Sequence, residues 1–328
     1  MTLSRFKNLT PALTLGLLWA LTASAQVEPI QEVFTPTGTY DPKVYGKVAV
    51  VQWNPPGAAP IGATQAVVDA FKEQNRQTLA GLIREAARNG AEMVITPEFG
   101  IVGYPDIPEL PSEEDEFRNR DDIRPYVEPI PGTTSNFFSA LARELKIYLQ
   151  VSFAEVEPAT DRYYNVGLAF DPTGNIVGKY HKMNLYQAET NFLSPGTQAV
   201  TYDSPFGKVG MVICADVYSN QPTQAYCNLG VKVLALSTSW AQWNTGMGTF
   251  QNAARRCNAY LLAANQTYFP DSGVINPDGT NQSHIRQTDG IAYGFLKRLK
   301  PAAKKGGANT TNQPVNPQPV RRPRRGAQ

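Results

Sequence analysis

The chain has 328 residues, of which 42% are hydrophobic, so it is long enough to bury one large core or two smaller ones. A net charge of +2 gives no indication of nucleic-acid binding, and no nucleic-acid partner is expected. Two histidines and three cysteines in no ligand-like spacing argue against a zinc site, and we expect neither a metal nor another cofactor.

The first 25 residues have the three parts of a secretory signal peptide. Arg5 and Lys7 form a basic start, residues 13–21 form an apolar stretch, and residues 23–25 form a small-residue cleavage site. The alternative is an uncleaved anchor, but a membrane span needs roughly 18–20 apolar residues. We therefore expect cleavage near Gln26, a secreted or periplasmic protein, and no stable membrane insertion after cleavage.

The first half of the chain predicts a leader followed by alternating strands and helices. Residues 26–45 lack periodicity and are expected to wrap the surface as a leader. Residues 104–132 are rich in Pro, Asp and Glu, which favours a long irregular segment across the surface. The predicted elements are a buried strand at 47–53, a helix at 67–89 stopped by Gly90, a strand at 93–95, and a helix at 134–145 capped by Thr133 or Thr134.

The second half continues the alternation. The predicted elements are strands at 148–153, 164–170 and 176–180, a strand at 209–213, a helix near 222–229, a strand at 231–237, a helix around 249–260 and a strand at 261–264, with turns at 171–174 and 277–279. Unbroken alternation over residues 46–300 predicts one α/β domain, and the hairpins predict mixed sheets.

The composition changes after Lys300. Residues 301–328 are dominated by Gly, Asn, Gln, Pro and Arg, and they cannot bury enough surface to become ordered. We expect a disordered basic tail, which is either solvated or in contact with an anionic surface.

The pairing of the cysteines stays open. In an oxidising compartment Cys227 and Cys257 could pair and leave Cys214 free, but two buried thiols are an equal alternative because the sequence does not supply Cα distances.

Three short apolar runs each end close to one reactive side chain. They lead to Glu98 after 93–95, to Lys182 after 176–180 and to Cys214 after 209–213. Each residue alone has an ordinary structural explanation, namely a helix cap for the glutamate, a surface charge for the lysine and a core thiol for the cysteine. Three such residues in this order, each after a predicted strand, favour a shared site.

A thiol, a carboxylate and a cation suit the hydrolysis of an amide, which needs a nucleophile, a proton carrier and stabilisation of an oxyanion. Cys214 would be the nucleophile, and Lys182 would lower the pKa of its thiol and hydrogen-bond the oxyanion. The backbone N–H of Ala215 or Asp216 would be a second donor, which makes both candidate substrate-binding residues. Glu98 would accept the thiol proton, deliver it to the leaving amine and later activate water.

Two other classes of protein compete with this hypothesis. A Cys–His protease would pair Cys214 with His181 or His284, but His181 adjoins Lys182 and would point to the opposite face of a strand. His284 lies in a polar stretch that is expected to be exposed. The second competitor is a secreted protein that binds its ligand without turnover.

The three motifs resemble the catalytic segments of the nitrilase superfamily, the carbon–nitrogen hydrolases. The resemblance spans residues 46–296 and is carried by Pro97-Glu98, Tyr180-His-Lys182-Met-Asn-Leu185 and Ile213-Cys214-Ala-Asp216, with flanks at Asn165, 171–174 and 261–265. It implies an α/β fold of the nitrilase type, a four-layer αββα sandwich with mixed sheets. It also implies the roles of base for Glu98, of oxyanion and thiolate partner for Lys182, and of nucleophile for Cys214.

The resemblance is strongest to the vanin and biotinidase branch, which consists of secreted amidases. It implies a small-molecule amide substrate, and a homodimer through the helix that follows the nucleophile. It further implies that Glu189 orients the substrate or the lysine, and that Trp240 lines the pocket, for which a core aromatic is the alternative. Vanins and biotinidase carry a further C-terminal domain in place of a short basic tail, so a carbamoylase, a nitrilase or an acyltransferase of the same superfamily stays an alternative.

Overall fold

The computed structural model describes residues 33–34, 40–105, 117–218, 221–240, 246–267, 271–286 and 288–299. The expected signal peptide, most of the expected leader and the expected basic tail lie outside the described residues.

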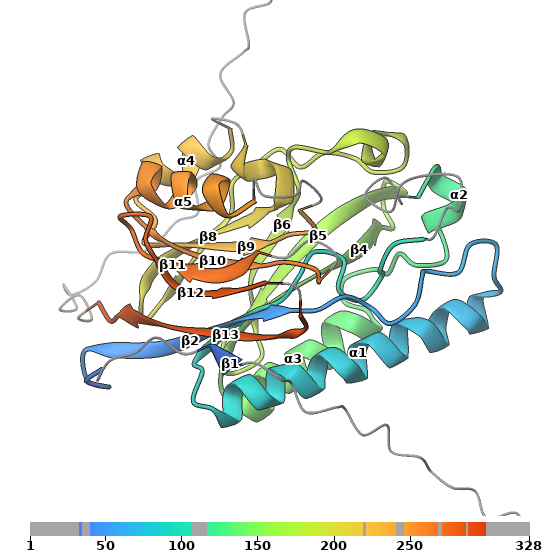
Figure 1. Cartoon of the computed structure of the whole chain (residues 1–328). Coiled ribbons are helices and arrows are strands. Elements are labelled where there is room, and N and C mark those ends of the chain that lie inside the picture. Colours follow the sequence, from blue (N-terminus) through green and yellow to red (C-terminus); the bar gives the residue numbers. More distant parts are fainter. Residues whose placement is uncertain are drawn as a thin grey trace, which may run out of the picture.

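The described residues form two stacked sheets with helices on both outer faces (Figure 1). The larger sheet contains, in spatial order, β1 (Val33–Phe34), β13 (Gly290–Lys297), β2 (Tyr45–Gln52), β3 (Met93–Ile95), β4 (Tyr148–Glu157), β5 (Arg162–Phe170) and β6 (Ile176–His181). The smaller sheet contains β12 (Asn281–Ile285), β11 (Ser272–Ile275), β10 (Tyr260–Ala264), β9 (Val233–Ser237), β8 (Gly207–Ile213) and β7 (Thr201–Ser204).

Two helices cover each outer face. Long helix α1 (Gln65–Arg88) and α3 (Thr133–Leu145) pack on the larger sheet, while α4 (Thr223–Asn228) and α5 (Gly246–Cys257) pack on the smaller one (Figure 1). A short helix, α2 (Arg120–Ile123), precedes α3. The expected four-layer αββα sandwich is therefore confirmed.

Both sheets are mixed, as expected from the hairpins. The pairs β2–β3, β3–β4, β8–β9 and β9–β10 are parallel, whereas β4–β5, β5–β6, β7–β8 and β10–β11 are antiparallel. Parallel neighbours end at the same edge of a sheet, and ligands of α/β proteins bind outside such carboxyl edges. Residues that follow β3, β8, β9 and β10 are therefore the first place to look for a site.

The apolar run in β2 is explained by burial on both faces. Val48 and Val50 pack into the hydrophobic cluster between the two sheets, while Ala49 and Val51 pack into the cluster under α1 and α3. Because neighbouring side chains on a strand point to opposite faces, a strand buried on both sides has no polar alternation.

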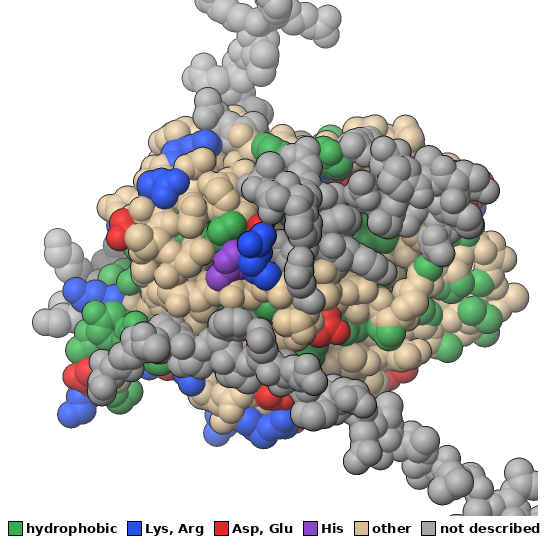
Figure 2. All heavy atoms as spheres, in the orientation of Figure 1, with side chains coloured by type: hydrophobic (Ala, Val, Ile, Leu, Met, Phe, Trp, Pro, Cys, Tyr) green, Lys and Arg blue, Asp and Glu red, His purple; other side chains and the backbone are tan. Residues whose placement is uncertain are grey.

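The surface carries charges of both signs. Figure 2 shows acidic and basic side chains in small separate groups over one face, which agrees with the small net charge of the whole chain. Among the described residues, none of the helices is both long enough and apolar enough to cross a bilayer.

Several local predictions were wrong. The helix expected at 249–260 ends at Cys257, because Asn258 takes a left-handed conformation with φ of +46° and the chain turns into β10. The segment expected to run irregularly over the surface contains α2, and it buries Phe117 and Tyr126 in the core. The prediction failed because it relied on the acidic and proline-rich composition of the segment and gave no weight to these two aromatic residues.

The cap of α3 also differs from the prediction. Gly132 occupies the position before the helix, and its N–H donates to the Ser135 hydroxyl at 2.8 Å. Thr134 instead donates its hydroxyl and its N–H to Glu128, at 2.9 and 2.8 Å. A buried carboxylate therefore accepts a backbone N–H in the first turn of this helix, and Thr134 is a donor there and not a cap.

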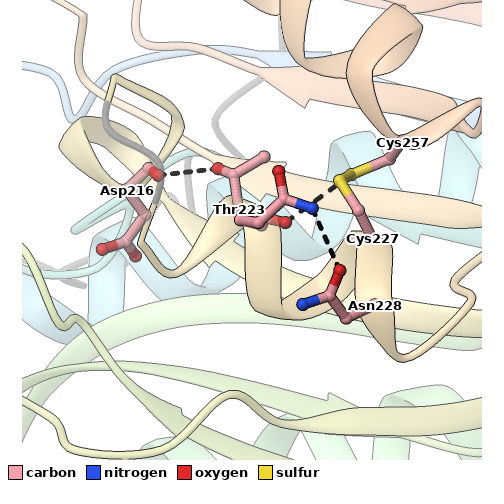
Figure 3. The surroundings of a disulfide bond; sticks show 6 residues. Asp216, Thr223, Cys227, Asn228 and Cys257 are labelled. Atoms are coloured by element: carbon pink, nitrogen blue, oxygen red, sulfur yellow. Dashed lines mark hydrogen bonds between the residues drawn. A yellow bond between two sulfur atoms is a disulfide. The ribbon is translucent and has the colours of Figure 1, made fainter.

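The structure settles the pairing of the cysteines. Cys227 of α4 and Cys257 at the end of α5 form a disulfide with their Cα atoms 4.5 Å apart, and Cys214 is free (Figure 3). The bond joins the two helices that cover the smaller sheet.

We expect the double substitution Cys227→Ser and Cys257→Ser to lower the free energy of unfolding by about 3–4 kcal/mol, because a closed loop of this length restricts the unfolded chain. The separation of the two cysteines is 30 residues. Denaturant titration with and without dithiothreitol measures the effect. Reductant should destabilise the parent protein and leave the double variant unchanged; equal stability of the two proteins without reductant contradicts the prediction.

Candidate active site

The structure places all three reactive residues at carboxyl ends of strands. Cys214 directly follows β8, Lys182 directly follows β6, and Glu98 lies three positions after β3. The strand β8 belongs to the smaller sheet and the other two to the larger sheet, so residues from both stacked sheets contribute to the site.

The Lys182 ammonium lies between two carboxylates. Its Nζ donates to Glu98 Oε1 at 2.8 Å and to Glu189 Oε2 at 2.6 Å. The exposed fractions of Glu98, Lys182 and Glu189 are 1%, 2% and 3%. Lys182 is therefore not a surface charge, and a buried charge of this kind is tolerated only when it is paired and hydrogen-bonded.

Asn165 is part of this cluster although its position in a strand gave no role to it from sequence. It lies within β5, and its Nδ2 donates to Glu98 Oε1 at 2.7 Å and to Glu189 Oε1 at 3.0 Å. The sequence did contain a signal for this role, namely a single amide side chain within the predicted strand Tyr163-Tyr-Asn-Val166. A polar side chain that is buried in a strand needs a hydrogen-bond partner.

The backbone completes the set of donors to the two carboxylates. Ser239 N–H donates to Glu98 Oε2 at 2.8 Å, and Tyr186 N–H donates to Glu189 Oε2 at 2.7 Å. Glu98 thus does not cap a helix, since its oxygens accept from a lysine, an amide and a backbone N–H after β9. These contacts hold each carboxylate in one orientation before any ligand binds.

Cys214 has an uncommon backbone conformation. Its φ is +43°, in the left-handed region that non-glycine residues rarely adopt, and it opens the 3₁₀ turn Cys214–Val217. The side chain is buried with Sγ 3.9 Å from the Ser239 carbonyl oxygen. The sharp change of direction from strand to turn keeps the thiol beside the residues that follow β9.

Burial raises the pKa of the Cys214 thiol, and the Glu98 carboxylate raises it further. Lys182 and the Thr238 hydroxyl lower the pKa by smaller amounts, so the net direction is upward. Lys182 thus acts on the thiol pKa in the expected direction, but burial and the Glu98 carboxylate outweigh it in the resting protein.

The charges of the cluster also shift one another. Burial raises the pKa of Glu98, and Glu189 adds to the increase while Lys182 and Asn165 oppose it. For Lys182, burial lowers the pKa, but attraction by Glu189 and Glu98 outweighs burial and the net pKa lies well above its usual range. The lysine is thus the fixed charge, and Glu98 is a carboxyl that can carry a proton.

Ala215 and Asp216, the candidate oxyanion donors, follow Cys214 in the same turn but differ in what their side chains contact. Ala215 adjoins the thiol in the same turn and is buried. The Asp216 side chain accepts hydrogen bonds from Tyr180, Ile213 and Asn184 and so does not face a ligand. Only its backbone N–H could serve the role that was expected for it.

Trp240 is both a core residue and a link toward the surface. It is buried, with its ring centroid 5.3 Å from that of Phe250 inside the core and 4.4 Å from that of Tyr218. Tyr218 is 45% exposed, so the pair leads from the interior to solvent. The Trp240 backbone N–H donates to Asn265 Oδ1 at 2.8 Å, directly after the serine that holds Glu98.

Neither histidine is bonded to the cysteine. His181 Nε2 lies 2.6 Å from Glu155 Oε2 and its ring stacks on Tyr164. His284 lies in β12 and is half-buried, with its Nε2 2.7 Å from Asp271 Oδ1. The expectation that this stretch is exposed was therefore wrong at His284. Among the described residues, no group of three or more His, Cys, Asp or Glu side chains is placed to hold a metal ion.

The chain is similar to known carbon–nitrogen hydrolases. The profile of the carbon-nitrogen hydrolase family matches residues 47–296. The pantetheinase of Mus musculus is 28% identical over 256 residues, which cover 65% of this chain and 47% of that protein. The omega-amidase NIT2 of Mus musculus is 30% identical over 199 residues, which cover 55% of this chain and 65% of that protein. This chain thus spans about half the length of the pantetheinase.

Solved structures show the same fold. Nit3 of Saccharomyces cerevisiae, a member of branch 10 of the nitrilase superfamily, aligns with a TM-score of 0.62 and 24% identity over 77% of this chain and 90% of that one. An amidase from Nesterenkonia sp. aligns with a TM-score of 0.61 and 20% identity over 80% of this chain and 93% of that one.

We expect Glu189→Gln to move the pH dependence of Cys214 alkylation to lower pH. Glu189 raises the pKa of both Glu98 and the Cys214 thiol, so removing its negative charge should lower both pKa values. The rate of reaction with iodoacetamide, followed by intact mass from about pH 7 upward to the alkaline limit of stability, measures the shift, because the thiol pKa is raised above its ordinary value of about 8.5. A control is Glu155→Gln, another buried carboxylate, which contacts Lys179 and His181. A midpoint that moves upward contradicts the prediction.

Proposed function

Because the chain belongs to the carbon-nitrogen hydrolase family, we propose that it hydrolyses a C–N bond of a small linear amide through a thioester on Cys214. One observation carries the proposal: a free, buried cysteine in a strained turn lies in the electrostatic field of an ammonium that is hydrogen-bonded to two buried carboxylates. This arrangement supplies the nucleophile, the proton carrier and the fixed cation that acyl transfer requires.

In the first half-reaction, the Cys214 sulfur attacks the amide carbonyl while its proton passes to Glu98. A raised carboxyl pKa suits this step, since a base whose pKa lies closer to that of its partner both accepts and returns a proton readily. The oxyanion is stabilised by the Lys182 ammonium and by the backbone N–H of Ala215. Glu98 then delivers the proton to the leaving nitrogen, the C–N bond breaks, and the acyl group stays on sulfur as a thioester.

In the second half-reaction, water replaces the amine. Glu98 removes a proton from the water as it attacks the thioester carbonyl, and the same two donors stabilise the second oxyanion. The C–S bond breaks, the acid leaves, and the proton held by Glu98 returns to the sulfur of Cys214. Glu189 accepts a hydrogen bond from the Lys182 ammonium and raises its pKa, which keeps the ammonium charged and oriented.

The substrate is a small amide of the kind named by the relatives. Pantetheinases and an omega-amidase are among the matching proteins, and both names denote cleavage of amides of small molecules. The aromatic pair Tyr218 and Trp240 beside the cysteine supports a substrate with an apolar part, because burial of apolar surface against aromatic rings is favourable. Nitrile hydrolysis and acyl transfer to another amine would use the same thioester.

Export from the cytoplasm is part of the proposal. The basic, apolar and small-residue parts of residues 1–25 support a cleaved signal peptide. The disulfide between α4 and α5 supports an oxidising destination, since disulfides persist in secreted and periplasmic proteins and are rare in reducing compartments.

Mass spectrometry of the intact protein tests the catalytic proposal. After brief exposure to pantetheine or to an ω-amide and an acid quench, the parent should carry one acyl group, and peptide mapping should locate it on Cys214. Cys214→Ala should show neither adduct nor turnover. Turnover that persists in Cys214→Ala would exclude the thioester, whereas a parent that binds these amides without adduct or turnover would point to a ligand-binding protein.

A matched pair of neighbouring residues provides the control. Lys182→Ala should lower kcat by about 10²–10³-fold, as the loss of an oxyanion donor does in other acyl-transfer enzymes. His181→Ala should retain activity, because its imidazole contacts Glu155 and Tyr164. The reverse result, an inactive His181 variant and an active Lys182 variant, would favour a Cys–His mechanism.

We expect the protein recovered after expression with its full N-terminal sequence in a secreting bacterium to begin at or near Gln26. N-terminal sequencing and intact mass of periplasmic and cytoplasmic fractions measure this. A variant with Arg5 and Lys7 replaced by Glu should accumulate uncleaved in the cytoplasm, because the basic start of the signal is lost. Uncleaved parent protein in the cytoplasm would contradict export.

A further inference from the structure

Asp216 is the most heavily hydrogen-bonded carboxylate near the cysteine that the proposed reaction does not use. It is fully buried. Its Oδ2 accepts from the Tyr180 hydroxyl at 2.7 Å and from Ile213 N–H at 3.0 Å, and its Oδ1 accepts from Asn184 N–H at 2.9 Å. Three donors from two segments of the chain therefore converge on one side chain.

Two of these donors lie on either side of Lys182 in the sequence. Tyr180 lies in β6, two positions before the lysine, and Asn184 lies two positions after it. Because the Asp216 carboxylate accepts hydrogen bonds from both Tyr180 and Asn184, it restricts the path of the backbone between these two residues. The position of the Lys182 Cα, and hence the direction of its side chain toward Glu98 and Glu189, is fixed from outside its own strand.

The third donor lies immediately before Cys214. By accepting from Ile213 N–H, the Asp216 side chain closes a small ring around the cysteine, whose φ of +43° is costly for a residue with a Cβ. A conformation of this kind persists only where surrounding contacts enforce it. The hydrogen bond therefore holds the turn that directs the thiol.

The backbone of Asp216 is anchored as well. The Thr223 hydroxyl at the start of α4 donates to the Asp216 carbonyl oxygen at 2.8 Å, and Cys227 of the same helix forms the disulfide to α5 (Figure 3). The residue is thus fixed through its main chain to the covering helices and through its side chain to both catalytic segments.

We propose that Asp216 is a positioning residue that holds the Cys214 turn and the Lys182 segment at a fixed distance, an inference that rests on the proposed function. Its contribution is geometric, since its carboxylate contacts no reacting atom and is occupied by three donors. The carboxylate must be ionised to accept all three, because a protonated carboxyl turns one oxygen into a donor. Burial raises the pKa of Asp216 to about 6, so the ionised form prevails at neutral pH.

The first test is Asp216→Asn, which keeps the shape but replaces one accepting oxygen by a donor. The amide NH₂ of the asparagine then points at an N–H or O–H donor and cannot accept from it. At least one hydrogen bond to the Lys182 segment or to the Cys214 turn is therefore lost. We expect kcat on the amide found by mass spectrometry to fall by about 10- to 100-fold with a smaller change in KM, since a displacement near 1 Å can reduce rate by that order. Circular dichroism checks that the variant is folded.

The second test removes one donor without changing any charge. Tyr180→Phe should lower kcat and move the alkylation midpoint of Cys214 to higher pH, because Lys182 lowers the thiol pKa and would no longer be held beside it. Tyr293→Phe is the matched control. Tyr293 lies in β13 and is also fully buried, and its hydroxyl accepts one hydrogen bond from Asn89 at 2.8 Å. Both variants should lose thermal stability, Tyr180→Phe more because its hydroxyl donates to a buried carboxylate, and only Tyr180→Phe should change the cysteine.

A change in stability alone would overturn the inference. If Tyr180→Phe lowers the melting temperature as Tyr293→Phe does but leaves the alkylation midpoint and kcat of the folded protein unchanged, the Asp216 contacts are structural only. The alkylation experiment needs no substrate. It therefore still tests the position of Lys182 relative to Cys214 if no amide is hydrolysed, and the two proposals can fail separately.

Discussion

The structure depends on one buried ammonium, that of Lys182, and on how it is balanced. Removing an ammonium from water costs several kcal/mol even after relaxation, and only well-placed partners offset this cost. Here two carboxylates accept from the lysine, and an asparagine and two backbone N–H groups fill their remaining positions. Because each group needs the others, the cluster has one arrangement, and the elements that carry its members are held together by it.

Burial and the surrounding charges together decide whether the cysteine carries its proton. Burial raises the pKa of both Glu98 and the Cys214 thiol, and the neighbouring carboxylates add to the increase while Lys182 opposes it. The proposed reaction therefore starts from a thiol whose proton moves to Glu98 during attack, and not from a standing thiolate. Lys182 acts on the negative charge that develops on the substrate oxygen, where its full effect is available.

The fold brings these residues together by using the edges of two sheets. One sheet supplies Glu98 and Lys182 after β3 and β6, and the other supplies Cys214 after β8. The sheets are joined near this point by Asp216, whose side chain reaches the Lys182 segment while its main chain is tied to α4. The disulfide then links α4 to α5, so the layer that covers the smaller sheet reinforces the same turn.

The sequence by itself determined an α/β class, most central strands and the three segments that carry Glu98, Lys182 and Cys214, because apolar runs and short motifs are local signals. The family and the αββα sandwich followed from the resemblance of those three segments to known hydrolases. Tertiary structure alone decided the disulfide, the burial of Phe117 and Tyr126, the role of Asn165 in the cluster and the direction of the Cys214 pKa. Each of these depends on distances between residues far apart in the chain. A pKa in particular is a sum over burial and several charges, and its sign is not contained in any single motif.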